Sequence, residues 1–152
     1  MKESYPILLL KYALYIAFIA GVILSVTMPI FIDDWLWTMI SGNHSTSEYR
    51  DFLQIFLVVL SIPCLWIVIE MIQMMNTIKT GPFIIRNTKA LNRIGFIFFI
   101  LSSAFIIKCF LFITIMTVVM AIMLFTIGLF SFTLSALIKV AIVFREENDL
   151  TI

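Results

Sequence analysis

The sequence predicts an all-α, polytopic membrane protein in which four transmembrane helices form a bundle. The first observation behind this is composition: the 152-residue chain is 62% hydrophobic and 12% charged, whereas a soluble domain is about half apolar and a quarter charged. The second is that the apolar residues gather in runs of about 20 residues or more, long enough to cross a bilayer. The third is that the cations concentrate in one loop between those runs. Lipid, rather than a soluble core, is the expected environment of the apolar residues.

The first predicted span is 11–32. A secretory signal peptide is the alternative, but its apolar region would be about 7–15 residues long and would end in a small-residue cleavage site. The run here is longer, and Val26-Thr27-Met28-Pro29-Ile30 fits such a site poorly. We therefore interpret it as a transmembrane helix. The acidic loop 33–51 follows, with Trp35 and Trp37 near the membrane boundary, where aromatic residues are common.

The remaining spans come from two apolar stretches. Residues 52–75 form one span, which Pro63 should kink because proline cannot donate to the helical ladder. Residues 94–144 would measure about 75 Å as one helix, more than twice the hydrocarbon thickness, so they must be divided. No Gly, Pro or Asn marks the turn, which we place at Thr117–Ala121. The four predicted spans are thus 11–32, 52–75, 94–117 and 122–144, in a single domain that covers the whole chain.

The loop 76–93 carries most of the basic residues. Gly81-Pro82 should break the preceding helix, and proline suits the first position of a new one. On that new helix Arg86, Lys89 and Arg93 are spaced i, i+3 and i+7, so they share one face. The pattern predicts a basic amphipathic helix that lies on the membrane surface before the third span.

Orientation follows from the distribution of Lys and Arg between the loops. Loop 76–93 contains four cations once Lys79 is included, whereas loop 33–51 contains only Arg50. Cytoplasmic loops carry an excess of Lys and Arg. We therefore expect loop 76–93, both termini and the tail 145–152 to be cytoplasmic, and loop 33–51 to be external.

Charged residues inside the spans suggest specific contacts. Glu70 and Lys139 lie at similar distances from the predicted cytoplasmic ends of their spans, which favours an ion pair between them, with Lys11 as the alternative partner. Lys108 lies about 21 Å along its span from Ile94, in the outer leaflet. It is expected to reach the acidic residues of the external side, which are Asp33, Asp34 and Asp51. Structural roles for these charges are favoured over a transport pathway, although intramembrane charges are often functional.

The residues that usually carry chemistry give little signal. His44 is the only histidine, and a metal site would need more ligands at fixed spacing. Cys64 and Cys109 fall inside predicted spans and are expected to be small buried residues. No nucleophile–base pair or phosphate-binding loop is apparent, so we expect neither an enzyme nor a cofactor. The last span also has a stripe of small residues, which predicts a helix-packing face: Ala121, Gly128, Ser131 and Ser135.

Two stretches carry a resemblance to a known family. The first has Gly81-Pro82-Phe83, then Asn87, Leu91 and Ile94-Gly95, and the second is Phe144-Arg145-Glu146-Glu147-Asn148-Asp149-Leu150-Thr151-Ile152. With them the chain resembles the YoaS-like proteins, a family of uncharacterised bacterial four-span membrane proteins. The family has no assigned activity. The resemblance implies a location in the bacterial plasma membrane, and a small helix-turn-helix regulator of the Cro/CI type as a possible partner, because such regulators are often encoded beside family members. The glycine that often precedes the family's acidic run is missing here.

Two classes of function remain open. The first is a regulatory or interaction protein that docks a cytoplasmic partner through a basic loop and an acidic tail. The residues involved would be Lys79, Arg86, Lys89, Arg93, Glu146, Glu147 and Asp149. The second is a small transporter, channel or immunity-type protein, which the lack of paired polar residues at the midplane disfavours. The cations could instead bind anionic lipid, and direct contact with nucleic acid is not expected.

Overall fold

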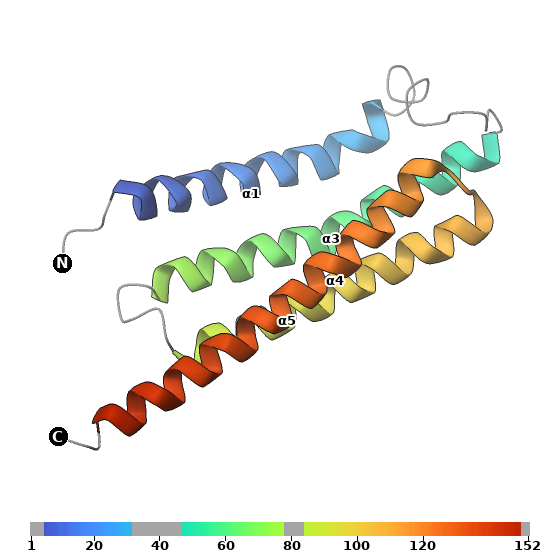
Figure 1. The fold of residues 1–152 in the computed structure, drawn as a ribbon. Coiled ribbons are helices and arrows are strands. Elements are labelled where there is room, and N and C mark those ends of the chain that lie inside the picture. The colour runs from blue at the N-terminus through green and yellow to red at the C-terminus, as the bar shows by residue number, and fades with distance from the viewer. Residues whose placement is uncertain (1–4, 32–46, 78–83, 150–152) are drawn as a thin grey trace.

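The computed structural model describes residues 5–31, 47–77 and 84–149. Within these ranges the chain forms four helices, and the all-α prediction is confirmed (Figure 1). All of them are long and apolar enough to cross a membrane, so the chain has the architecture of a multi-pass membrane protein. The helices are α1 (Tyr5–Phe31), α3 (Ser47–Thr77), α4 (Ile85–Leu111) and α5 (Ile115–Asp149).

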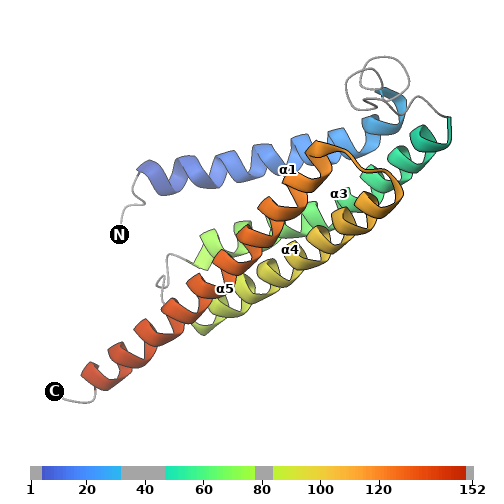
Figure 2. The same cartoon turned by 45° about the vertical axis from the view of Figure 1, so that its right-hand side comes forward.

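The helices pack mainly in chain order. α1 packs against α3, α3 against α4, and α4 most extensively against α5. Figures 1 and 2 show α3, α4 and α5 side by side, and α5 continuing past the start of α4 toward the C-terminus. The buried apolar core lies between α3 and α4 and consists of Leu60, Ile67, Ile94 and Leu101. Most of the remaining apolar surface is exposed, as expected for helices that face lipid.

The turn between the last two helices differs from the sequence prediction. α4 ends at Leu111, α5 begins at Ile115, and both ends of the predicted turn, Thr117 and Ala121, lie within α5. The backbone N–H of Phe112 donates to the carbonyl of Lys108 at 2.8 Å and closes α4. The first turn of α5 forms around Thr114, whose carbonyl accepts the N–H of Thr117 at 3.0 Å. A threonine before a helix is a known start signal, so the turn is marked by Thr114 and not by Gly, Pro or Asn.

The basic segment, predicted as an amphipathic surface helix before the third span, forms the first turns of α4 itself. α4 runs without interruption from Ile85, so Arg86, Lys89 and Arg93 belong to its first turns. The opposite face of those turns is buried, with Thr88 and Leu91 at 1% and 8% exposure. Packing on this face holds the segment in line with the rest of α4. The predicted break at 81–82 lies outside the described residues.

Glycines bring α4 and α5 into close contact. A Cβ atom added to Gly95 would lie 3.2 Å from the carbonyl oxygen of Gly128, and one added to Gly128 would lie 3.3 Å from the carbonyl oxygen of Gly95. Both distances are shorter than ordinary van der Waals contact, so the two backbones can approach this closely only where side chains are absent. Small residues serve this purpose between membrane helices.

Serine hydroxyls continue the same interface in both directions. Each donates to a backbone carbonyl on the facing helix: Ser102 to Ala121 at 2.9 Å, Ser131 to Leu91 at 2.8 Å, and Ser135 to Thr88 at 3.0 Å. Together with the Gly95–Gly128 contact, positions 88, 95 and 102 of α4 face positions 135, 128 and 121 of α5, so these contacts recur every seven residues in opposite directions, as in an antiparallel coiled coil. The small-residue stripe of the last span is therefore a helix-packing face, as predicted.

Candidate functional site

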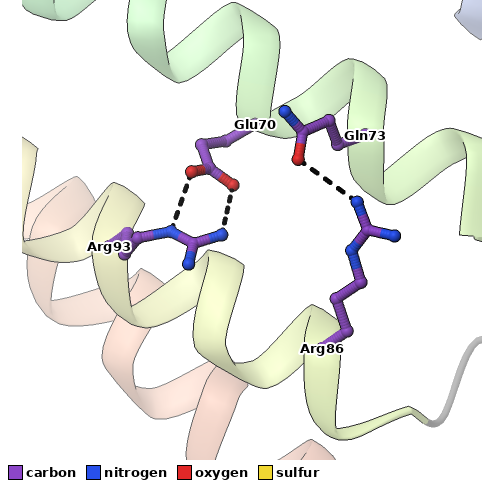
Figure 3. Close-up of polar contacts among 4 residues, drawn as sticks. All are labelled: Glu70, Gln73, Arg86 and Arg93. Atoms are coloured by element: carbon purple, nitrogen blue, oxygen red, sulfur yellow. Dashed lines mark hydrogen bonds and ion pairs between the residues drawn. The ribbon is translucent and has the colours of Figure 1, made fainter.

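A buried carboxylate on α3 is paired with an arginine on α4. Arg93 contacts Glu70 through two parallel bonds, Nε to Oε1 at 2.8 Å and Nη2 to Oε2 at 2.8 Å (Figure 3). The Glu70 side chain is 6% exposed and that of Arg93 is 52% exposed. A buried carboxylate is costly unless it is paired and hydrogen-bonded, and the planar guanidinium satisfies both oxygens at once. This pair ties α3 to α4.

The predicted partner of Glu70 was therefore wrong. Neither Lys139 nor Lys11 pairs with Glu70, whose two oxygens both contact Arg93. The α4–α5 register explains the error: Ser135 faces Thr88, so Lys139 lies beside the start of α4, about 13 Å along the axis from the level of Arg93. Equal distance from the predicted span ends did not correspond to equal depth, because α5 extends to Asp149.

Two further polar contacts join α3 and α4 beyond this pair. Arg86 Nη2 donates to Gln73 Oε1 at 3.3 Å (Figure 3), and the Thr77 hydroxyl lies 2.7 Å from Asn87 Oδ1. Together the three contacts form what we call the polar seam, which consists of Glu70, Gln73, Thr77, Arg86, Asn87 and Arg93. The sequence held a signal for it, because 70, 73 and 77 share one face of α3 at spacing i, i+3 and i+7.

A second buried charge of the described residues lies near the opposite end of the same two helices. Lys108 is 6% exposed, and its Nζ lies 5.8 Å from the ring centre of Tyr49 and 5.6 Å from that of Phe56. Contacts between rings extend this group to Phe52, Phe105 and Phe112. We call Lys108 and these five aromatic residues the aromatic cage. An ammonium group over aromatic faces is attracted by their quadrupoles.

None of the predicted acidic partners of Lys108 is found beside it in the described residues. Asp51 is exposed and makes no ion pair with Lys108, so that contact is not formed. Asp33 and Asp34 lie outside the described residues, as does His44. Within the described ranges, Lys108 is stabilised by aromatic rings and not by a carboxylate.

The remaining predicted site residues of the described chain lie on the first turns of α4 and on the last turns of α5. Lys89 is exposed on α4, and Glu146 and Glu147 are exposed on the last turns of α5, which Asp149 ends. In the described ranges the basic turns of α4 do not contact the acidic end of α5, because Arg86 and Arg93 contact α3 instead. Lys79 lies outside those ranges.

The two cysteines are not the buried residues that the sequence predicted. Cys64 is exposed, Cys109 is partly exposed, and both are free thiols. Both lie on helices with broad lipid-facing surfaces, where an apolar position need not be covered by protein.

Comparison with known proteins adds no relative: no protein family, curated protein or solved structure matches the chain. The class that the fold defines is a helical protein with four segments able to span a membrane.

Proposed function

We propose that this chain is a regulatory or interaction protein of the bacterial plasma membrane that docks a cytoplasmic protein through the polar end of its bundle. The observation that carries the proposal is the concentration of charge there: Arg86 and Lys89 are exposed on the first turns of α4, and Glu146 and Glu147 on the end of α5. The opposite end of α3 and α4 instead encloses its cation among aromatic rings. Complementary charged surfaces favour specific association.

The length of α5 supports this proposal. Its 35 residues measure about 52 Å, whereas the hydrocarbon layer is about 30 Å thick. Ser135 faces Thr88 near the start of α4, so roughly the last ten residues of α5 run beyond that helix (Figure 1). This extension presents exposed Val143 and Phe144 beside its charged residues. A helix with apolar and charged side chains suits recognition by a groove on a partner.

The proposal includes the orientation of the protein in the membrane, with the polar end of the bundle on the cytoplasmic side. The excess of Lys and Arg around the start of α4 favours the cytoplasmic side for this end, and with it for both termini. The resemblance to YoaS-like proteins favours a small Cro/CI-type regulator as the partner. Binding at such a surface would be sensitive to salt, because exposed ion pairs are screened.

The transporter alternative receives no support from the geometry. A polar cavity faced by both Glu70 and Lys108 would support a transporter. Glu70 contacts Arg93 instead, and Lys108 lies fifteen residues further along α4, about 22 Å away. Within the described residues, the two buried charges belong to separate groups.

The proposal is tested by reversing charge on each docking element. Membranes with the full-length protein are cross-linked to a purified small Cro/CI-type regulator, and recovery is compared with Glu146→Lys/Glu147→Lys and with Arg86→Glu/Lys89→Glu. Each reversal should lower recovery at least several-fold, whereas the control Lys139→Glu, an exposed lysine of α5 outside the two sets, should leave it unchanged. Equal recovery from all four proteins would contradict docking and favour lipid anchoring of the cations.

A further inference from the structure

An open groove lies between α3 and α4 beside the polar seam. Its volume is about 600 Å³, within the size range of pockets that hold small ligands. The lining is apolar along most of its length and comes from Ile62, Pro63, Trp66, Phe96, Ile97 and Phe132. The only polar lining residues in the described chain are Asn92 and Arg93, which are adjacent. The groove therefore has one polar end and an apolar body.

The polar and apolar parts of the groove follow one another in the same order as the headgroup and acyl chain of a phospholipid. Asn92 and Arg93 lie toward the start of α4, and Phe96 and Ile97 one turn deeper along the helix. Trp66, which is 56% exposed, lines the side on α3 one turn deeper than Glu70, at the level of Phe96 and the acyl chain. A phospholipid bound here would place its headgroup at Arg93 and an acyl chain over the apolar residues.

The charge of the polar end selects an anion. Arg93 uses Nε and Nη2 for Glu70, and its third guanidinium nitrogen, Nη1, points away from that carboxylate in Figure 3. Lys89 is exposed four residues earlier on α4, on the same face as Arg93. Arg93 and Lys89 outweigh the single charge of Glu70, so this end remains positive. Basic pockets between transmembrane helices bind anionic lipid headgroups.

We propose that this groove is a binding site for one anionic phospholipid, whose phosphate contacts Arg93 and whose acyl chain lies against Trp66 and Phe96. In this arrangement Glu70 positions the guanidinium and also weakens its attraction for the phosphate. The site shares Lys89 with the proposed docking surface but does not include Glu146 or Glu147, and its presence does not depend on the proposed function.

Trp66 provides a native probe. The chain has three tryptophans, so replacing Trp35 and Trp37 by Phe leaves Trp66 as the sole fluorophore. The full-length protein is reconstituted in phosphatidylcholine vesicles that contain either brominated phosphatidylglycerol or the same fraction of brominated phosphatidylcholine. The anionic lipid should quench Trp66 more strongly, with a preference of about fivefold at low salt. Equal quenching by the two lipids would overturn the proposal.

Two substitutions in the ion pair should act in opposite directions. Glu70→Gln removes the competing carboxylate and should raise the preference for phosphatidylglycerol, whereas Arg93→Gln should bring it close to one. If the pair had a purely structural role, both substitutions would change the preference for phosphatidylglycerol in the same direction. That result would contradict the proposal. Lys139→Gln, which removes an exposed cation away from the groove, should keep the preference of the parent protein.

A second pair of variants leaves the ion pair intact, so the test stands even if Arg93→Gln does not fold. Ile62 lines the groove and is 63% exposed, while Ile55 lies seven residues earlier on the same face of α3 and is 67% exposed. Ile62→Phe should fill part of the groove and lower the preference at least twofold, and Ile55→Phe should not. An unchanged preference in Ile62→Phe would place the anionic lipid outside the groove.

Discussion

The two ends of the α3–α4 pair solve the same physical problem in different ways. Each contains a charged side chain that is nearly buried, Glu70 at 5% exposure and Lys108 at 6%. At the polar seam the charge is matched by an opposite charge, with both carboxylate oxygens bonded to Arg93. In the aromatic cage the charge is surrounded by rings. A charge inside a span therefore need not indicate a transport pathway, because each of these two charges is stabilised by its own neighbours.

The largest expected effect comes from removing one partner of the ion pair. Arg93→Leu leaves the Glu70 carboxylate buried without compensation. Breaking a fully buried pair costs about 3–5 kcal/mol, and because Arg93 is half exposed we expect about 2–3 kcal/mol here. The free energy of unfolding in detergent micelles, measured by denaturant titration, provides the check.

A double-mutant cycle then separates this pair from the one that the sequence suggested. Glu70→Leu/Arg93→Leu should recover most of the lost stability, because no unpaired charge remains buried. A cycle between Glu70→Ala and Lys139→Ala should instead show no coupling. Additive effects of the Glu70 and Arg93 substitutions, or strong coupling between Glu70 and Lys139, would contradict the claim that Arg93 stabilises Glu70.

The aromatic cage should respond in the opposite way to loss of its charge. Lys108→Met keeps most of the length of the side chain, removes the cost of a buried cation, and leaves no carboxylate of the described chain unpaired. We expect unfolding stability to stay within about 1 kcal/mol of the parent protein or to rise. A loss as large as that of Arg93→Leu would mean that Lys108 has an ionic partner in the folded protein.

The smallest expected effect concerns the rings themselves. Phe56→Leu weakens the cation–π contact of Lys108, which should contribute about 0.5–2 kcal/mol. In a Lys108→Met background the same substitution should cost less, and the difference is the coupling energy. Equal losses in both backgrounds would show that Phe56 acts by packing alone, for instance against Phe105.

Much of the fold was predictable from the sequence because lipid solvent imposes simple requirements. Long apolar runs predicted the membrane-spanning helices, and the small residues of α5 predicted its packing face, since both signals lie within one segment. The partner of Glu70 was not found, because pairing between helices depends on their register. That register is set here by Gly95 against Gly128 and by Ser135 against Thr88, contacts between residues more than thirty positions apart.

The sequence predicts which charged residues gather at the polar end, but it does not predict which of them contact one another. The spacing of Arg86 and Arg93 predicts that they share one helical face, but it does not predict which helix that face contacts. In the structure it contacts Gln73 and Glu70 of α3. Polar residues at 70, 73 and 77 could have indicated this contact, had they been matched with the polar residues that begin α4.

The central claim is that the polar end, with its basic turns and the extension of α5, faces the cytoplasm. Cysteine accessibility in intact cells tests it directly, in a Cys64→Ser/Cys109→Ser background with single cysteines placed at Lys89, Glu147 and Ser45. A membrane-impermeant maleimide should label the Ser45→Cys protein from outside, and the Lys89→Cys and Glu147→Cys proteins only after permeabilisation. Labelling of Lys89→Cys in intact cells would reverse the orientation and contradict a cytoplasmic docking surface.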